Sequence, residues 1–530
     1  MRNRKYQVWL PVLFSLVLTG GMYIGYKLSR DRMGARFFRN EHLSPMEEIM
    51  GLINKEYVDP VNMDTLQVNT INKILGSLDP HSTYITPEAL QNINEDMAGS
   101  FQGIGIDYQI KEDTAIVLHL FPDGPSAKAG LQKGDRLIAA NKVSLIGKDF
   151  TSDSVRIQIR SIKDSKISLT VARNNQLHTF TVNKAVVPKP SVVAAYMIRP
   201  NTGYIRISRF TETTYPEFMI ALEKLKKAAL QRLILDLRGN GGGVLQQAID
   251  VVDEFLPDDK LVVYTQGTKI GRTDYKCRRD GLFEKGKVAV LVDEESASAS
   301  EIVAGALQDW DRATIIGRRT FGKGLVEEQY NLSNGGALRL TVARYYTPLG
   351  RCIQKPYTKD EDDYENDLHK RLESGELENG DTVKNHGKAY RTPGGKTVYD
   401  GGGISPDIFV SYDSLQHPNA VVALHIHGRI NEFALQYYEA HKTVFDAYSD
   451  PLDLDAKYQP GEVEWHGLVQ FAQGKNVQIA DINPKAKAAL LDDFKSDIAK
   501  IRWYPEGYYI IHNIKDPAVQ IALHTLDSTP

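Results

Sequence analysis

Three serines stand at alternate positions in a run of small residues, and one of them could act as a nucleophile. Ser296, Ser298 and Ser300 follow an apolar run at 288–292 and precede a segment with a helical pattern. A catalytic serine needs an exposed hydroxyl, a base and donors for the developing oxyanion, and the N–H groups at a helix start supply such donors. Ser298 and Glu301 also match the capping-box pattern, so a purely structural helix cap is the alternative.

The base for such a serine could be a histidine or a lysine. Histidine is the usual partner, but of His81, His119 and His178 only His81 lies in a turn that resembles a motif. A lysine that burial keeps neutral can also accept a proton. Lys323 follows Ser298 in sequence and lies between two glycines in a predicted loop at a strand end. Most lysines in such loops are solvated, so the pattern alone leaves the choice of base open.

The glycine-rich run 239–243 follows a strand of the buried type and precedes a helix. Such a turn suits a second oxyanion donor or a clamp on a substrate backbone. It also opens like a dinucleotide-binding loop, but Val244 stands where the third glycine is required. Gly324 follows Lys323, so no phosphate-binding G-K-[S/T] motif exists, and no residue spacing is typical of a metal site. We therefore predict chemistry without a metal ion or an organic cofactor.

The overall composition limits the classes of partner. The 530 residues carry a net charge of -3, and no basic stripe with interleaved aromatic residues is present, so nucleic-acid binding is not expected. Two cysteines, Cys277 and Cys352, cannot form a disulfide framework or a four-cysteine metal site, and we expect free thiols. A chain of this length is predicted to hold several domains.

The N-terminus has the pattern of a membrane-targeting segment. Arg2, Arg4 and Lys5 precede an uncharged, largely apolar run at 8–26. We predict that residues 1–28 form an uncleaved signal anchor in the inner membrane, with the rest of the chain in the periplasm of a bacterial envelope. The alternative is a cleaved signal peptide that releases the protein to the periplasm. Basic residues on both sides of the run leave its orientation open.

The remaining chain divides by its hydrophobic patterns. Residues 29–98 are predicted to form a charged tether, over 29–40, and a helical region. Residues 99–187 are rich in short strands. Residues 188–415 alternate strands with helices, which is typical of a layered α/β core. This core includes a hairpin at 328–348 that turns at Asn334-Gly335, and an exposed polar insertion at about 357–390. Residues 416–530 read as a second helical region without a chemical motif.

Several segments, in order along residues 45–410, resemble the carboxyl-terminal processing, or tail-specific, proteases. They are LDPHSTYI, FQGIGI, GPSAKAGLQKGDRLIAAN, GYIRISRF, DLRGNGGG, SASASEIVAGALQDWDRATIIGRRTFGKGLV, LTVARYYTPLGRCIQ and DGGGISPDI. These proteases are serine peptidases with a Ser-Lys dyad and an embedded PDZ domain. The resemblance implies a multidomain α+β protein, in which a crotonase-like α/β core carries an inserted β-rich PDZ domain and flanking helical regions.

The resemblance also implies roles for individual residues. The family's nucleophile falls on Ser298 and its base on Lys323. The oxyanion donors would be the backbone N–H groups of Ala299 and of a glycine in the Gly241–Gly242 turn. The PDZ loop that binds a peptide carboxylate corresponds to Gly103, Ile104, Gly105 and Ile106.

One position departs from the family pattern. Glutamine usually stands four residues after the lysine, but here the residue is Glu327. A carboxylate beside a lysine favours the ammonium form, which works against a neutral base. Three resolutions are open: Glu327 is protonated, Gln329 on the same strand face takes the role, or activity is weak or requires a partner.

The function implied by the resemblance is an endopeptidase that captures C-terminal tails of exported proteins and cleaves them through an acyl-enzyme. A non-catalytic PDZ-type scaffold is the alternative, supported by Glu327. An acyl-CoA enzyme with a crotonase-like core is a third possibility, against which the PDZ segment argues. The helical regions could hold an adaptor protein or a second copy in a homodimer.

Overall fold

The computed structural model describes residues 4–30, 44–111, 113–121, 123–147, 151–162, 164–357, 364, 366–380 and 387–528. The chain divides into two compact units, Met1–Lys73 and Ile74–Pro530, which are described separately. Nearly all of the predicted charged tether at 29–40 lies outside the described residues, and so does part of the insertion predicted at 357–390.

The first unit consists of helices. They are α1 (Arg4–Arg30), α2 (Pro45–Glu56) and most of α3 (Met63–Gly76). α2 begins at a complete capping box, in which Ser44 and Glu47 each accept a hydrogen bond from the other's backbone N–H. Among the described residues, no helix combines the length and the apolar character needed to cross a membrane. The predicted membrane anchor at residues 1–28 is therefore not supported.

The β-rich block begins and ends on two paired strands. β2 (Ser100–Gly103) and β9 (Ala185–Pro188) run antiparallel, with Ser100 opposite Pro188, so the chain joins and leaves the block at one place. The block's own sheet has the order β3-β4-β5-β7-β8, with β6 paired to β5. Its elements are β3 (Ile106–Lys111), β4 (Thr114–Leu120), α5 (Pro125–Ala129), β5 (Arg136–Ala140), β6 (Val143–Ser144), α6 (Ser152–Ser161), β7 (Lys166–Arg173) and β8 (Gln176–Asn183). α4 (Pro87–Ala98) precedes it.

The central sheet of the second unit is mainly parallel. Its six strands have the order β10-β11-β12-β15-β16-β21, and only the β10–β11 pair is antiparallel. They are β10 (Val192–Arg199), β11 (Thr202–Ile207), β12 (Arg232–Asp236), β15 (Lys287–Val292), β16 (Thr314–Gly317) and β21 (Ile408–Phe409). β12 and β15 are buried along almost their whole length, as expected for parallel strands covered on both faces.

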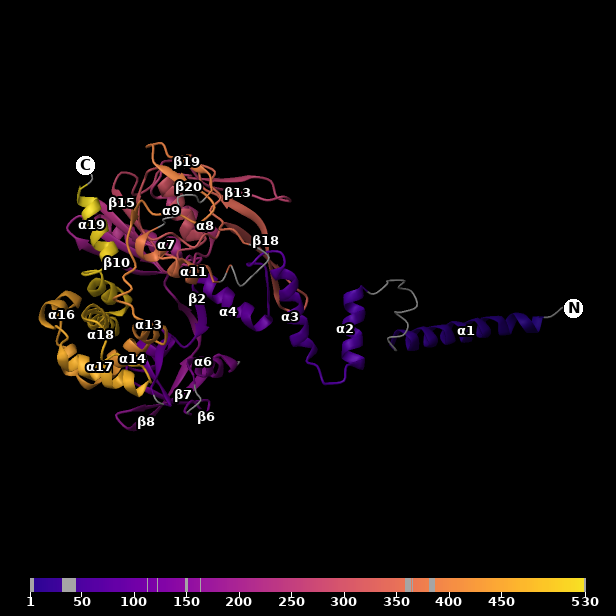
Figure 1. Cartoon of the computed structure of the whole chain (residues 1–530). Coiled ribbons are helices and arrows are strands. Elements are labelled where there is room, and N and C mark those ends of the chain that lie inside the picture. The colour runs from indigo at the N-terminus through magenta and orange to yellow at the C-terminus, as the bar shows by residue number, and fades with distance from the viewer. Residues whose placement is uncertain are drawn as a thin grey trace. The chain divides into compact units, whose positions relative to one another are not determined.

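Helices cover both faces of this sheet (Figure 1). α7 (Thr214–Lys227), α8 (Leu245–Asp253) and α9 (Ala299–Asp309) share one apolar core with the sheet. On the opposite face, α19 (Pro517–Ser528) packs Val519, Ala522 and Leu523 against the strands. The last helix therefore completes the sheet's outer layer, whereas the sequence placed it in a separate C-terminal region. The apolar stripe of α19 indicated that one face of the helix is buried. It could not indicate whether the central sheet or the C-terminal helices cover that face.

A second sheet carries the predicted hairpin. β17 (Leu325–Asn331) pairs antiparallel with β18 (Ala337–Tyr346), and Gly335 takes a φ of 84° in the turn. β18 also pairs with β1 (Thr83–Ile85) and β13 (Leu261–Gln266), and β14 (Thr273–Lys276) pairs with β13. Hydrogen bonds hold the LDPHSTYI segment against β18. The buried Asp79 carboxylate accepts hydrogen bonds from Ser82 and from Thr341 of β18.

The polar segment at 357–390 is not simply exposed. Its described part includes α11 (Asp367–Glu373) and α12 (Glu376–Asn379), followed by the hairpin of β19 (Ala389–Arg391) and β20 (Thr397–Tyr399). Arg371 and Leu377 are buried, and Arg371 donates to the backbone oxygen of Arg319 and forms an ion pair with Glu376. The segment is polar in composition yet packs on the core, because its charges are paired within the protein.

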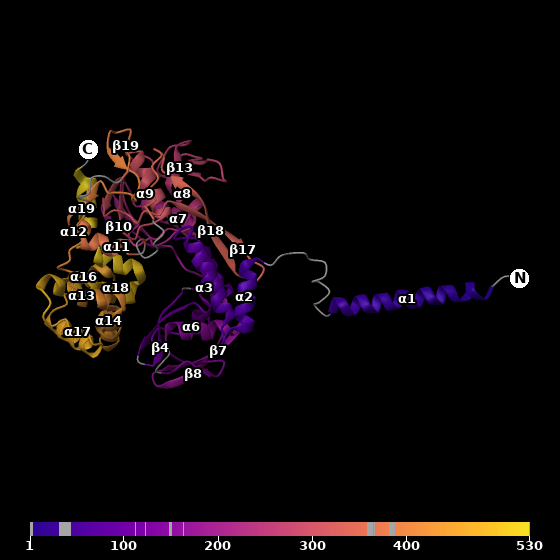
Figure 2. The same ribbon diagram turned by 45° about the vertical axis from the view of Figure 1, so that its right-hand side comes forward.

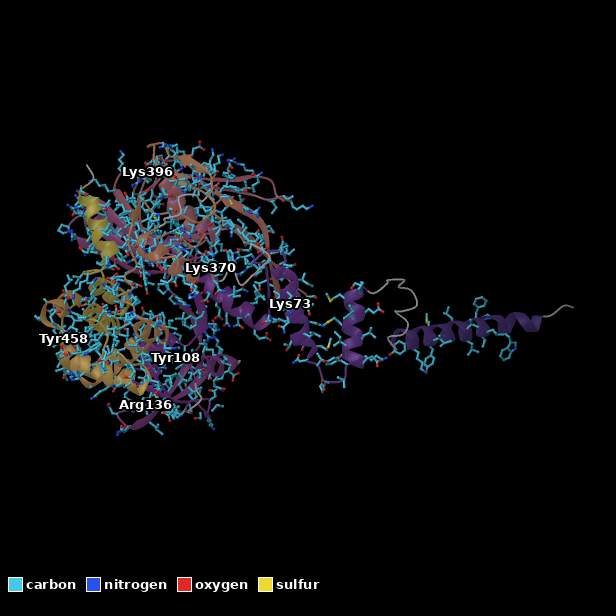
Figure 3. The ribbon with its side chains drawn as sticks, viewed as in Figure 1. Lys73, Tyr108, Arg136, Lys370, Lys396 and Tyr458 are labelled. Atoms are coloured by element: carbon cyan, nitrogen blue, oxygen red, sulfur yellow. The ribbon has the colours of Figure 1, made fainter. Side chains whose placement is uncertain are left out.

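The other C-terminal helices form their own core. Figure 2 shows these helices grouped together, and Figure 3 labels Tyr458 among them. They are α13 (Asn419–Ile426), α14 (Arg429–Ala440), α15 (Lys442–Phe445), α16 (Pro451–Lys457), α17 (Glu462–Gly474) and α18 (Pro484–His512). α18 is kinked at Trp503 and Tyr504, and Pro505 explains the break because its nitrogen cannot donate to the carbonyl one turn earlier. Lys133 of the β-rich block donates to that carbonyl, the backbone oxygen of Ile501, at 2.7 Å.

Candidate active site

Three neighbouring strands of the central sheet place the candidate residues together. β12, β15 and β16 are adjacent and parallel, so their carboxyl ends lie at one edge of the sheet. β12 leads into the glycine-rich run 239–243, β15 into the serine turn (residues 293–300) and β16 into the lysine loop (residues 318–324). Ligands of parallel α/β sheets bind at this edge. The register of the sheet thus explains why segments distant in sequence meet.

Ser298 lies in a strained backbone conformation at the start of α9. Its φ of 53° and ψ of -114° are rare for a residue other than glycine and cost about 1–3 kcal/mol. The side chain makes no capping hydrogen bond, although the Ser298 N–H donates to Glu301 Oε2 at 2.9 Å. Only half of the predicted capping box therefore forms. The turn holds the half-buried hydroxyl away from the helix backbone, as in other strand-to-helix turns that present a serine.

The glycine-rich run approaches the serine turn more closely than any side chain would permit. A Cβ atom on Gly242 would lie 2.7 Å from both Ser298 Cβ and the Ala297 oxygen. The Gly242 N–H already donates to Asn240 Oδ1 at 2.9 Å, and Asn240 is fully buried. Gly241 is exposed, and a Cβ there would meet nothing within 4 Å. Of the two glycines predicted as oxyanion donors, Gly241 is therefore the one whose N–H donates to no acceptor among the described residues.

The lysine loop places an ion pair beside the serine turn. Lys323 Nζ lies 2.9 Å from Glu327 Oε1, and their side chains are 23% and 15% exposed. The distance is that of an ion pair, but Glu327 Oε1 has no hydrogen-bond partner, so the two groups are poorly aligned. Gln329, two positions further along β17, is exposed, and no hydrogen bond joins it to Lys323 among the described residues. Glu327, rather than Gln329, is the direct neighbour of the lysine.

Glu301 joins the serine turn to the lysine loop. Its carboxylate is fully buried and accepts four hydrogen bonds, from the backbone N–H groups of Ser298, Gly322 and Lys323 and from the Thr320 hydroxyl. Burial raises the pKa of Glu301 to about 7, while the four donors favour its ionised form. The sequence indicated Glu301 only as part of a helix cap, because the pattern S-x-x-E carries no information about the second loop.

Tyr345 is a second connection that the sequence did not reveal. Its buried hydroxyl lies within hydrogen-bonding distance of the backbone oxygens of both Ser298 and Lys323. Ala343 and Tyr345 alternate as the buried positions of β18, a pattern that predicts an inward side chain but not its partner. The backbones that carry the serine and the lysine are therefore tied together by one carboxylate and one phenol.

A cavity of about 680 Å³ contains the candidate residues. Its walls come from the glycine-rich run, the serine turn, the lysine loop, the hairpin and the end of α4. The predicted residues that line it are Ser298, Ala299, Lys323, Glu327, Gln329, Gly241 and Gly242. His81 is not among the lining residues. Its Nε2 lies 2.8 Å from the Tyr364 hydroxyl, and burial together with nearby Lys323 and Lys355 lowers its pKa to about 4.

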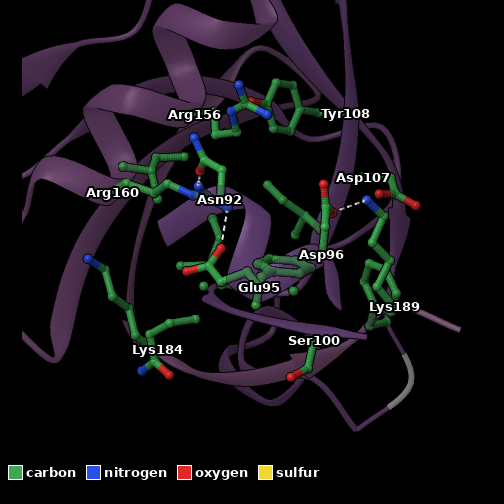
Figure 4. A pocket seen from close by; sticks show the side chains of 18 residues that line it. Asn92, Glu95, Asp96, Ser100, Asp107, Tyr108, Arg156, Arg160, Lys184 and Lys189 are labelled. Atoms are coloured by element: carbon green, nitrogen blue, oxygen red, sulfur yellow. Dashed lines mark hydrogen bonds and ion pairs between the residues drawn. The ribbon is translucent and has the colours of Figure 1, made fainter. Parts of the chain in front are cut away.

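The predicted carboxylate loop lines a separate pocket of about 300 Å³ (Figure 4). Gly103, Ile104, Gly105 and Ile106 all contribute to its wall. α4 supplies the opposite wall, where Glu95 Oε2 accepts a hydrogen bond from Arg160 of α6 at 2.7 Å. Asp96 of the same helix lines both this pocket and the 680 Å³ cavity, and pairs with Lys189 and Arg209. α4 is therefore a wall common to the two sites.

Comparison with known proteins identifies the family. A family model described as peptidase family S41 matches residues 201–363, and one described as PDZ domain matches residues 102–183. A carboxy-terminal-processing protease of Bartonella bacilliformis is 36% identical over 324 residues, which cover 59% of this chain and 73% of that protein. The chain belongs to peptidase family S41. This S41 chain is accordingly a serine peptidase of the carboxy-terminal-processing group, and its β-rich block is a PDZ domain.

A second sequence relative of the S41 chain agrees with this assignment. The carboxy-terminal processing protease CtpB of Bacillus subtilis is 32% identical over 326 residues, covering 60% of this chain and 66% of that protein. A solved photosystem II D1 C-terminal processing protease is 25% identical, covers 69% of this chain and 86% of its own, and superimposes with a TM-score of 0.35. The two sequence relatives confirm the predicted family.

Proposed function

We propose that this S41 peptidase captures C-terminal tails of exported proteins through its PDZ domain and cleaves them with a dyad of Ser298 and Lys323. One observation carries the proposal: the uncapped Ser298 hydroxyl, in a strained turn, shares a cavity with the lysine loop. The core that holds the dyad would be of the crotonase-like type. The site of action would be the bacterial cell envelope.

In the proposed mechanism, neutral Lys323 accepts the proton of Ser298 as its Oγ attacks the scissile carbonyl carbon. The oxyanion that forms is stabilised by the N–H groups of Ala299 and Gly241. When the intermediate collapses, the amine product leaves with the proton from Lys323, and an ester links the new carboxyl group to Ser298. Water then attacks this ester while Lys323 accepts its proton. The second collapse returns that proton to Ser298 and releases the product as a carboxylic acid, which loses its proton to water.

Glu327 is the ion-pair partner of the base in this scheme. Its Oε1 lies 2.9 Å from Lys323 Nζ, and an ammonium group held in such a pair cannot act as a base. The reaction therefore requires loss of a proton from the pair before Ser298 can be activated. We expect turnover to rise with pH. The exposed position of Gln329 supports Glu327 as the group that determines this behaviour.

The PDZ pocket would hold the end of the substrate. The loop at 103–106 would bind the terminal carboxylate and the adjacent apolar wall its last side chain, as in other PDZ–peptide complexes. Asp96 lines both cavities, so α4 would lead the substrate from this pocket to the cavity that contains Ser298. An adaptor protein or a homodimer that uses the helical regions stays a prediction.

Labelling with a fluorophosphonate probe tests the assignment of the nucleophile. Wild-type protein should be labelled on Ser298 and should cleave a peptide with a free apolar C-terminus. Ser298→Ala should lose labelling and about 10⁴-fold or more in kcat. Lys323→Ala should lose turnover as well, and both variants should still bind the tail peptide, as measured by fluorescence anisotropy. Cleavage by Ser298→Ala would refute the assignment.

The Lys323–Glu327 ion pair favours a second candidate function, a PDZ scaffold without turnover. In that case the lysine stays an ammonium at every accessible pH and the protein only binds tails. The same probe separates the two functions. A scaffold would bind the tail peptide but would react with the fluorophosphonate no faster than Ser298→Ala does.

A further inference from the structure

The hairpin of β17 and β18 forms one wall of the cavity that contains Ser298. Arg339 and Tyr345 of β18 both line this cavity, as does Gln329, the cross-strand neighbour of Arg339 on β17. Side chains an even number of positions apart on a strand lie on the same face. On that face the Tyr345 hydroxyl reaches the backbone oxygens of Ser298 and Lys323. Arg339 therefore lies on the face of β18 that is turned toward the candidate catalytic residues.

The charged side chains that the structure describes in this cavity are paired except for one. Asp96 forms an ion pair with Arg209 at 3.2 Å, and Glu327 forms one with Lys323 at 2.9 Å. Arg339 is the remaining charged residue of the lining, and its side chain forms no ion pair or hydrogen bond with any described residue. Three basic residues against two acidic ones leave the lining with an excess of one positive charge. The charges of the cavity therefore favour an anionic ligand at Arg339.

A further carboxylate near this face of β18 already has its own donors. Asp79 accepts hydrogen bonds from the Thr341 hydroxyl, from the Ser82 hydroxyl and from two backbone N–H groups of its own turn. Thr341 lies two positions after Arg339, but Asp79 is buried and does not line the cavity. Arg339 thus faces the cavity without a protein carboxylate beside it in the part of the chain that the structure describes.

The chemistry of arginine defines the ligand. The guanidinium group is planar and presents a fork of N–H donors that matches the two oxygens of a carboxylate. In a peptide substrate, aspartate and glutamate side chains supply this group. The register also limits where the acidic residue lies, because Arg339 is opposite Gln329, two positions beyond Glu327 on β17. That offset is about 7 Å, or roughly two residues of an extended peptide. The acidic side chain would therefore lie a few residues from the scissile bond.

We propose that Arg339 is a specificity-determining residue that binds the carboxylate of an aspartate or glutamate side chain of the substrate. The substrate is then selected twice, by its C-terminus in the PDZ pocket and by an acidic residue near the bond that is cleaved. This inference rests on the proposed protease function, because it assigns a specificity to the same active site.

Paired peptides test the role of Arg339. Each pair has the same free apolar C-terminus and differs only by glutamate or glutamine at one position near the scissile bond, which isolates the negative charge. Wild-type enzyme should prefer glutamate at one position by about fivefold in kcat/KM. Arg339→Gln should lower this ratio to about one, with the loss confined to the glutamate peptide. Arg339→Glu should reverse the preference, because two carboxylates repel each other.

Arg344→Gln is the matched control. Arg344 lies on β18 as well, but it is exposed, donates to the Tyr357 hydroxyl and does not line the cavity, so this variant should retain the preference. An equal loss on both peptides in Arg339→Gln, or a glutamate preference that survives in it, would overturn the proposal. If the wild-type enzyme cleaves glutamine peptides but prefers glutamate at no position, the role of Arg339 alone is wrong. If it cleaves no peptide and reacts with no fluorophosphonate, the protease function is wrong.

Discussion

The serine turn and the lysine loop contribute to one site but are built on different principles. The serine turn is held by backbone contacts: the conformation of Ser298 is constrained by Gly242 on one side and by Glu301 on the other. The side chain of Lys323 instead depends on a single, poorly aligned neighbour, Glu327. Several contacts therefore fix the position of Ser298, whereas one ion pair holds the Lys323 side chain. We expect substitutions of the residues around Ser298 to abolish activity. Substitutions of the residues beside Lys323, such as Glu327, should change the rate of turnover.

The largest effect should come from closing the gap between the glycine-rich run and the serine turn. Gly242→Ala places a Cβ 2.7 Å from Ser298 Cβ, at a φ of 94° that side chains rarely adopt. We expect kcat to fall at least about a hundredfold. Gly241→Ala is the control, since its Cβ meets nothing and its N–H is kept, and it should stay within about threefold of wild type. Equal effects in the two variants would contradict the close approach.

Breaking the link between the two loops should have the next largest effect. Glu301→Gln replaces an acceptor of four hydrogen bonds by an amide, whose NH₂ group faces two of the donors. We expect a loss of about 2–5 kcal/mol in the free energy of unfolding and of roughly a hundredfold in kcat. Urea unfolding and steady-state kinetics measure these, with the exposed Glu328→Gln as control. An unaltered kcat would show that the two loops hold their positions without Glu301.

A moderate effect on catalysis is expected from replacing Glu327, the ion-pair partner of Lys323. Glu327→Gln removes the carboxylate that pairs with the Lys323 ammonium group, so this ion pair no longer has to be broken before the lysine can act as a base. We expect kcat/KM at pH 7 to increase severalfold and the pH–rate profile to change. Glu328→Gln, on the same strand, should leave the profile in place. Identical pH–rate profiles for Glu327→Gln and wild type would contradict the role assigned to Glu327.

The smallest effect concerns stability near the lysine loop. Burial lowers the pKa of His81 to about 4, below the value of about 6.5 in an unfolded chain. The unfolded chain therefore binds a proton that the folded chain excludes between these pH values, and stability should fall as pH drops from 6.5 to 4. His81→Gln should flatten this decline, as followed by urea unfolding at several pH values. Parallel curves for the two proteins would rule out this contribution.

The sequence predicted the strands and loops of this site better than it predicted their connections. Alternating apolar strands and helices indicated the central sheet, and Asn334-Gly335 indicated the hairpin, because both patterns are local. The link through Glu301 depends on two loops that are distant in sequence. The hydrogen bond from the Gly242 N–H to Asn240 Oδ1 likewise depends on the orientation of the Asn240 side chain. Such contacts form only when the parallel strands bring the loops together.

The outer parts of the fold were the least predictable. α19 has the apolar stripe of any surface helix, and nothing local distinguishes the central sheet from the helical core as its partner. The burial of Arg371 shows the converse case, because charged residues suggested an exposed insertion and their pairing within the protein allowed packing. Composition indicates the tendency of a segment, whereas burial depends on the partners that the tertiary fold provides.

The pairing of β2 with β9 has a consequence for the evolution and engineering of the molecule. Because the first and last strands of the PDZ domain are neighbours, the two cut points of the surrounding chain are already adjacent. A short linker could replace the whole domain without stretching the α/β core. The domain can therefore be regarded as an exchangeable cassette, whose removal or replacement leaves the two ends of the surrounding core adjacent.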